Sequence, residues 1–521
     1  MANNKNDKDR TRSGLIERLS LPALQAITDR IYAGGSTKGR SPASPRAISI
    51  GSAVHRYNSR IVEEQAIDIE LFLRHAYILG STGSGKTYLI YLLIKSLVEK
   101  DQGFCCVDIH GDLTEMLLNF FASVSDPALS RQINSDRLVL IEPFNQEWAP
   151  SFNPLHITAR QGAYQQATDM LAIFKKLWRD VAWGPRMEEV LRNLLLTLSQ
   201  ADLTLCDAQR LLTDAAFRSA VLGRINDDLV KDYWRERFEP LSDRMKPMYT
   251  EPVLNKITAF TNDYYLHHVL AQRGQSIDFR DLLDRRRWIL INISKGTLRE
   301  NAHLIGSLFI SKIRTAAMSR ADIPEERRVP SFLVVDEFQN FLHYNFEEIL
   351  SEARKFRLGL IMAHQHLEQL DRSMRESIFG NVASTFMFRL GHTDVREVAA
   401  AFKEAEQPLV KQALGSLGTG EVVRRESDGS YRIIKIHRIE KPTALPEKVS
   451  RLRAASCQRY CRRRRDIEAQ LRAASEPTTA LRAAQPAPNN PVAPAQPAGR
   501  LIPRRRRGHG AAAADFEEGD L

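Results

Sequence analysis

Eight consecutive residues have the types and the spacing of a loop that binds phosphate. They read G-x-x-x-x-G-K-T, and they are Gly80, Ser81, Thr82, Gly83, Ser84, Gly85, Lys86 and Thr87. Glycines let the backbone N–H groups of such a loop converge on phosphate oxygens, and the helix that follows adds partial positive charge. The lysine can then reach the β- and γ-phosphates, and the threonine hydroxyl can hold Mg²⁺. The sequence therefore predicts that ATP and Mg²⁺ bind here.

A pair of carboxylates far downstream supplies the second half of a hydrolytic site. Four apolar residues, 332–335, are followed directly by Asp336 and Glu337. In a nucleotide hydrolase such a strand delivers the aspartate to the edge where Mg²⁺ binds, and the glutamate activates a water for attack on the γ-phosphate. The pattern is common on its own, but beside a complete phosphate loop it predicts hydrolysis. We therefore assign Asp336 and Thr87 to Mg²⁺, and Glu337 and Lys86 to catalysis.

Two further polar residues flank an apolar stretch at 358–362. Gln365 follows it, on the same edge as the phosphate loop, where its amide can hydrogen-bond the γ-phosphate or the attacking water. Arg354 precedes it and should lie at the opposite edge or on a flank, better placed for a neighbouring subunit's nucleotide than for its own. The alternative is that Arg354, Lys355 and Arg357 form a solvated basic face.

The elements that must position these residues alternate between strand and helix. Besides the stretches named above, strands are predicted at 75–79, 104–109, 138–141, 288–293 and 385–389, with a hairpin at 420–436. This alternation is typical of a parallel sheet with helices on both faces. Residues 158–285 interrupt it with a purely helical pattern. The chain is therefore predicted to be an α/β protein whose main domain, 46–157 and 286–445, carries an inserted all-helical domain at 158–285.

The two ends of the chain differ from this body in composition. Residues 1–45 are predicted to hold an amphipathic helix at 13–32 and a Gly/Ser/Pro linker. Residues 446–521 contain arginine runs at 462–465 and 504–507 and a Pro/Ala-rich stretch between them. Such a composition buries little apolar surface, so the sequence predicts a disordered basic tail.

The net charge of +11 is concentrated in these ends. Residues 1–50 hold nine Lys and Arg against four Asp and Glu, residues 446–521 hold fifteen against eight, and the body is nearly neutral. Basic ends favour an anionic partner, either nucleic acid or a membrane surface, although the charges can also serve only to keep flexible tails solvated. No stretch approaches the ~18 apolar residues of a membrane span, and no signal peptide is evident. Cytoplasmic residence is therefore predicted.

The order of these motifs resembles the ring-forming ATPases of the FtsK/HerA superfamily, and most closely the conjugative coupling proteins of type IV secretion systems. The resemblance covers about residues 45–445. It rests on the phosphate loop and its preceding strand, on Asp108-Ile109-His110-Gly111-Asp112 after the second strand, on Phe152-Asn153-Pro154-Leu155, and on the order of the downstream site residues. It implies a RecA-like P-loop domain. Coupling proteins carry N-terminal membrane helices, which this sequence lacks.

The resemblance further implies a homo-hexameric DNA translocase in which Arg354 acts in trans and Gln365 senses the bound nucleotide. Arg299, in a loop just after the strand at 288–293, is an alternative trans arginine or a channel residue. The implied partners are DNA and, beyond it, a relaxase, a secretion-channel protein or a nuclease. Two related functions stay open: a ring ATPase that moves or unfolds protein, and a HerA-like DNA-processing ATPase that acts with a nuclease. A third alternative is a scaffold that is not a motor and uses nucleotide only to assemble.

Overall fold

The structure, a computed structural model, describes residues 46–54, 62–157, 162–178, 183–274, 276–341 and 346–475. The helix expected at 13–32, the linker after it and the Pro/Ala-rich stretch lie outside these residues. The chain divides into two units, Met1–Leu471 and Arg472–Leu521. None of the helices in the described ranges combines the length and apolar character that crossing a membrane requires.

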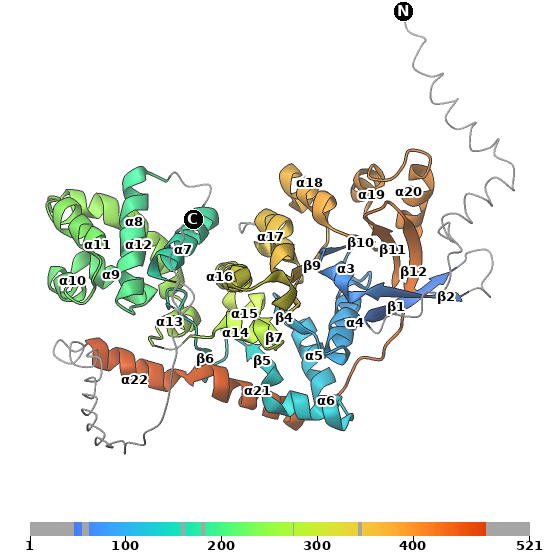
Figure 1. Cartoon of the computed structure of the whole chain (residues 1–521), viewed down its shortest axis with the longest axis horizontal. Helices are drawn as coiled ribbons and strands as arrows, with labels where there is room; N and C mark the ends of the chain where they lie inside the picture. The colour runs from blue at the N-terminus through green and yellow to red at the C-terminus, as the bar shows by residue number, and fades with distance from the viewer. Residues whose placement is uncertain are drawn as a thin grey trace, which may run out of the picture. The chain divides into compact units, whose positions relative to one another are not determined.

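An eleven-stranded sheet forms the frame of the first unit (Figure 1). Its order is β2-β1-β12-β11-β10-β3-β9-β8-β4-β7-β5, and the seven strands from β10 to β5 are parallel. Their bounds are β3 Ala76–Leu79, β4 Gly103–Asp108, β5 Leu138–Ile141, β7 Trp288–Asn292, β8 Ser331–Val335, β9 Leu358–His364 and β10 Ser384–Met387. The predicted mostly parallel sheet is confirmed.

Four antiparallel strands extend the sheet beyond β10. They are β1 Ala47–Val54, β2 Val62–Asp68, β11 Glu421–Glu426 and β12 Tyr431–Ile436. The β11–β12 pair is the predicted hairpin, and its turn contains Gly429 at φ 85°, a left-handed conformation that suits glycine. β11 pairs directly with β10, so the hairpin lies beside the strand that neighbours β3.

Helices cover both faces of the parallel strands. Successive side chains of each strand point to opposite faces, so they enter two different cores. Along β3, Tyr77 and Leu79 belong to one core and Ala76 and Ile78 to the other. The second core is closed by α4 Lys86–Glu99 and α5 Asp112–Ser123. The first core is closed by α16 Asn301–Met318, α17 Phe346–Glu352 and α18 Arg372–Asn381. Shorter helices complete the connections: α3 Ile69–Phe72, α6 Pro127–Gln132, α15 Lys295–Leu298, α19 His392–Ala399 and α20 Gln407–Ser416.

The described residues between β6 (Trp148–Pro150) and β7 contain helices and no strand, as the sequence predicts. α8 begins at Pro185, where the missing N–H and fixed φ of proline suit the first helical position. The helices are α7 Ala163–Leu177, α8 Pro185–Gln200, α9 Ala208–Thr213, α10 Ala215–Leu222, α11 Asp228–Asp232, α12 Met245–Thr261, α13 Tyr264–Leu270 and α14 Phe279–Asp284.

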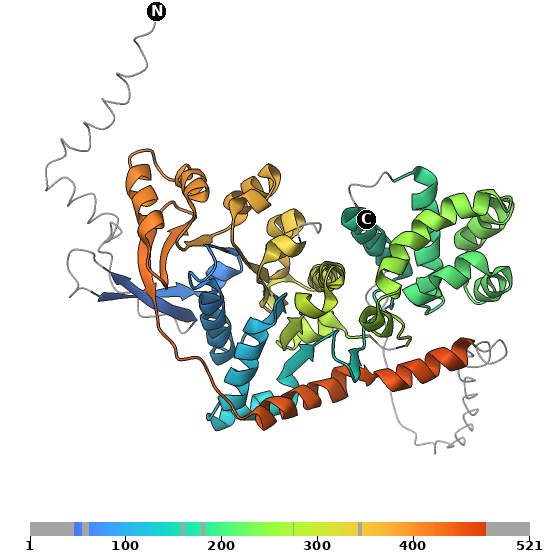
Figure 2. The ribbon, with the colours of Figure 1, turned by 180° about the vertical axis from the view of Figure 1, so that it is seen from behind.

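The prediction of disorder from residue 446 onward is wrong for residues 446–475. This segment forms α21 Pro446–Tyr460, the short strand β13 Cys461–Arg463 and α22 Arg464–Ser475, coloured red in Figure 2. Few apolar residues are present, but Val449 and Leu452 share one face of α21 and are buried. Arg464 is also buried, because carbonyls of Pro143, Asn145 and Tyr265 accept its hydrogen bonds. The mean composition of the segment reveals neither the buried face of α21 nor the carbonyl partners of Arg464.

Candidate active site

The phosphate loop joins β3 to α4 at the carboxyl edge of the sheet. Gly83 and Gly85 have φ of 74° and 116°, which only glycine adopts readily. Lys86 is 5% exposed, and its Nζ donates to the Gly80 carbonyl at 2.7 Å and to the Ser81 carbonyl at 3.4 Å. Burial lowers the pKa of Lys86, against the opposing attraction of Glu337 and Asp336. The ammonium group of Lys86 therefore lies against the start of the loop and close enough to Asp336 and Glu337 to be attracted by their charges.

Residues from the neighbouring strands hold the other side of this loop. The Arg389 carbonyl, just past β10, accepts from the N–H and the hydroxyl of Ser81, each at 3.1 Å. The Gly420 N–H, just before β11, donates to the Ser84 carbonyl at 3.1 Å. A Cβ on Gly80 would lie 2.6 Å from Phe388 Cβ, so this close packing requires glycine. Sequence reasoning missed Arg389 and Gly420, because neither belongs to a motif.

Asp336 and Glu337 follow β8 at the same edge, as predicted. Asp336 is anchored by its N–H, which donates to the Val107 carbonyl of β4 at 3.2 Å. Burial, with the nearby charges of Asp108 and Glu337, raises the pKa of Asp336 to about 7. A divalent cation offsets such crowded negative charge, so this carboxylate fits a Mg²⁺ ligand. The backbone of Glu337, directly after β8, has a left-handed φ of 51°.

The Glu337 carboxylate is held by two glutamine amides. Gln365 Nε2 donates to Glu337 Oε1 at 2.8 Å, while Gln365 Oε1 accepts from the Thr82 hydroxyl at 2.9 Å. Gln365 therefore links the phosphate loop to the carboxylate. Gln339 Nε2 donates to the second oxygen, Oε2, at 2.6 Å. Gln339 was missed in the sequence, since a polar residue two positions after the acidic pair carries no motif.

Asp108, which ends β4, braces the neighbouring backbone. Its two oxygens accept from the N–H groups of His110, Gly111 and Thr114 and from the Thr114 hydroxyl, at 2.7 to 3.1 Å. The side chain thereby satisfies N–H groups at the start of α5, as a helix cap does.

Arg354 lies at the opposite edge of the sheet from the phosphate loop. It belongs to the turn Ala353–Phe356, here called the arginine turn, which immediately precedes β9. The seven residues of β9 separate this turn from Gln365, a span of roughly 20 Å at about 3.3 Å per residue. Arg354 is exposed, and its side chain makes no hydrogen bond or ion pair to any residue that the structure describes. Its position excludes contact with a nucleotide in its own loop.

Arg299 lies on the other edge, after α15 and the end of β7. Its backbone has φ 53°, and its side chain is exposed. The N–H of Lys295, at the start of the same short helix, donates to the Ile109 carbonyl next to β4. Arg299 therefore sits on the same edge as the phosphate loop, and Arg354 does not. This difference separates the two candidate trans arginines geometrically.

A family model for the central domain of the helicase HerA matches residues 48–313, more than half of the chain. The chain belongs to the HerA helicase family. This membership confirms the predicted FtsK/HerA superfamily. A second family model, the TraM recognition site of TraD and TraG, matches residues 330–406, which include Asp336, Glu337, Arg354 and Gln365.

Individual relatives of this HerA-family chain are distant. The DNA double-strand break repair helicase HerA of Sulfurisphaera tokodaii is 22% identical over 381 residues, covering 69% of this chain and 64% of the relative. The chain thus spans less than two thirds of that relative's length. The unbound bacterial conjugative coupling protein TrwBdeltaN70 has a TM-score of 0.53 at 14% identity, over 80% of this chain and 93% of that one. The plasmid coupling protein TrwB with ADP and Mg²⁺ has a TM-score of 0.52 at 15% identity, over 78% and 98%. These structures share the fold.

Proposed function

We propose that this protein is a ring-forming ATPase that couples ATP hydrolysis to translocation of DNA. The observation that carries the proposal is the division of the predicted catalytic residues between two edges of one sheet. Lys86, Asp336, Glu337 and Gln365 meet at the carboxyl edge, while Arg354 lies at the amino edge. Membership of a helicase family and a coupling-protein fold support DNA as the substrate that is moved.

The carboxyl edge contains what ATP hydrolysis requires. The loop N–H groups and Lys86 bind the β- and γ-phosphates, and Glu337 accepts a proton from the water that attacks the γ-phosphorus. Thr87 and Asp336 would hold Mg²⁺, which neutralises phosphate charge. Gln365 touches both Thr82 and Glu337, so a change at the γ-phosphate end of the loop reaches the catalytic carboxylate through one side chain.

Arg354 completes this site in a neighbouring subunit. Its own nucleotide lies across the sheet, so only a second copy of the chain can place its loop against the arginine turn. Repeating the contact head to tail gives a closed ring. The resemblance to the ring-forming ATPases of the superfamily implies six copies in that ring. An arginine supplied in trans stabilises the charge that develops on the transferred phosphoryl group.

DNA is the polymer that best fits the remaining features. The loop 294–299 presents exposed Arg299 at the carboxyl edge, and six copies of such a loop multiply a small positive charge around a channel. Contacts of this kind follow the phosphate backbone without reading sequence. The partner protein then decides the pathway in which the motor works. A relaxase would direct it to DNA transfer or secretion, and a nuclease would direct it to repair, the process named for the partly matching HerA relative.

The proposal predicts DNA-stimulated ATP hydrolysis. Hydrolysis should be measured at low salt alone, with single-stranded DNA, with double-stranded DNA and with an unfolded protein, using Lys86→Ala as the inactive control. We expect at least one form of DNA to raise kcat severalfold, and added salt to remove the stimulation because counterion release drives the binding. Stimulation by unfolded protein and by neither DNA would replace this function with protein translocation.

A further inference from the structure

Two arginines from the segment between α16 and β8 bind the backbone of the arginine turn. Arg320 Nη1 donates to the Phe356 carbonyl at 3.1 Å, and Arg328 Nη1 donates to the Lys355 carbonyl. Just upstream, His75 Nε2 donates to the Leu350 carbonyl of α17 at 3.1 Å. Side chains thus bind two carbonyls of the turn and one carbonyl of the helix before it, while the side chain of Arg354 stays exposed. Such preorganisation is useful where a group must reach a fixed point on a partner.

Arg320 is the central member of this set. It follows α16, is 0% exposed, and uses all three guanidinium nitrogens. Besides the Phe356 carbonyl, its Nε donates to Asp284 Oδ1 at 2.9 Å and its Nη2 donates to the Ser331 hydroxyl at 3.0 Å. Ser331 begins β8, the strand that ends at Asp336. One buried side chain therefore connects the arginine turn, the start of β8 and α14.

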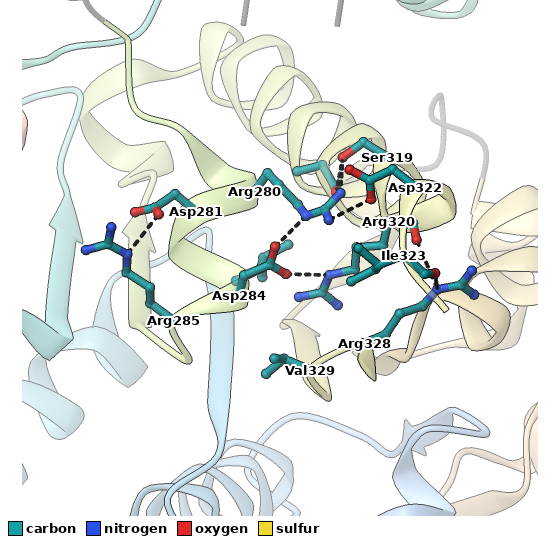
Figure 3. A network of polar contacts seen from close by, with 12 residues as sticks. Arg280, Asp281, Asp284, Arg285, Ser319, Arg320, Asp322, Ile323, Arg328 and Val329 are labelled. Carbon is teal, nitrogen blue, oxygen red and sulfur yellow. Dashed lines mark hydrogen bonds and ion pairs between the residues drawn. The ribbon is translucent and has the colours of Figure 1, made fainter. Parts of the chain in front are cut away.

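Asp284 ties this arginine to the helical insertion (Figure 3). It is the last residue of α14, and its second oxygen, Oδ2, accepts from Arg280 Nε at 2.5 Å. Arg280 is itself buried, and it also donates to the Ser319 hydroxyl and to Asp322, both at 2.9 Å. A continuous chain of contacts therefore runs from the Phe356 carbonyl through Arg320 and Asp284 to Arg280 within α14.

We propose that Arg320, braced by Asp284, is a positioning residue that sets where Arg354 is presented to the neighbouring subunit. The proposal rests on the proposed function, because it assumes that Arg354 acts in trans. It adds a physical route by which the last helix of the insertion fixes the arginine turn. A movement of α14 relative to β8 must either carry the turn with it or break the Arg320–Asp284 pair, which leaves a buried guanidinium without its carboxylate.

A purely structural role for the pair would lower stability without a directional effect on catalysis. A positioning role makes a different demand: the defect must appear in the neighbour's site and not in the subunit's own. Arg320→Lys keeps the charge and one donor for Asp284 but loses the fork to Phe356 and Ser331. We expect kcat to fall about a hundredfold, the scale of a misplacement near 1 Å, while KM for ATP stays unchanged.

The test mixes Arg320→Lys with Glu337→Gln subunits and measures ATP hydrolysis over a range of ratios. An interface between an Arg320→Lys nucleotide site and the intact arginine turn of a Glu337→Gln subunit has every required group, so activity should exceed that of either parent. Asp284→Asn serves as a second variant where Arg320→Lys fails to fold. Asp281→Asn, which removes the exposed partner of Arg285 on the same helix, is the matched control and should leave kcat unchanged.

A parallel mixture of Arg354→Ala with Glu337→Gln separates the two possible failures. Recovery with Arg354→Ala but not with Arg320→Lys or Asp284→Asn overturns the positioning role and leaves the trans arginine intact. No recovery in either mixture overturns the trans arginine itself. Equal loss of kcat in Asp281→Asn and Asp284→Asn also contradicts the proposal, because the effect would then belong to α14 in general.

Discussion

Replacement of Glu337 by glutamine is expected to lower kcat for ATP hydrolysis by about 10²- to 10⁴-fold, the contribution of a positioned general base. The amide cannot take the proton of the attacking water, although it has nearly the shape of the carboxylate. Affinity for ATP should persist, since the phosphate loop and Lys86 are untouched. The measurement is steady-state hydrolysis beside the binding of a fluorescent ATP analogue.

The matched control for this variant is Glu99→Gln. Glu99 is exposed, pairs only with Lys95 among the ion pairs of the described residues, and lies at the end of α4 that is remote from the phosphate loop, so loss of its charge should change neither hydrolysis nor binding. A Glu337→Gln protein that hydrolyses ATP at the wild-type rate would show that another group activates the water. Loss of ATP binding together with activity would instead point to damage in the loop, transmitted through Gln365 or Gln339.

Arg354→Ala is expected to lower kcat by ~10³-fold or more, the effect of removing an arginine supplied in trans. Each subunit should still bind ATP normally, because its own Arg354 is separated from its phosphate loop by the full length of β9. Lys355→Ala removes the neighbouring exposed cation from the same turn and should leave kcat nearly unchanged. If both substitutions have equal, small effects, the turn is the solvated basic face that the sequence also allows.

Mixing identifies which subunit Arg354 serves. In mixtures of Arg354→Ala and Glu337→Gln, a site with an intact Glu337 can meet a neighbour with an intact Arg354. Activity absent from both parents should therefore return at intermediate ratios. Mixtures that follow the simple average of their parents would contradict catalysis across the interface, even where each single substitution is inactivating.

The carboxyl edge of the sheet could be predicted from the sequence because its parts are local. Strands buried on both faces read as short apolar runs, and the polar residue after each run falls at the same edge. This reasoning places Lys86, Asp336 and Gln365 together without knowledge of the strand order, and it places Arg354 opposite them. The connection of Gln365 to Thr82 and Glu337 then follows from β3 and β8 both flanking β9.

Features that depend on distant pairing could not be predicted. Arg389 and Gly420 support the phosphate loop only because β10 and β11 pair beside β3, and no motif marks either residue. In the sequence Arg464 is one of four consecutive arginines in the tail. In the structure it is buried, and three backbone carbonyls from distant segments accept its hydrogen bonds. Composition predicts disorder there because it averages over the few spaced apolar side chains and ignores carbonyl partners.

Displacement of streptavidin from biotinylated DNA tests the central claim most directly. The assay uses linear single- and double-stranded DNA with the biotin at either end, ATP or a non-hydrolysable analogue, and the Lys86→Ala protein in parallel. The account predicts that the wild-type protein displaces streptavidin from at least one of these DNAs only with hydrolysable ATP, and that Lys86→Ala displaces none. Rapid ATP hydrolysis with no displacement from any end of either DNA would contradict a DNA motor.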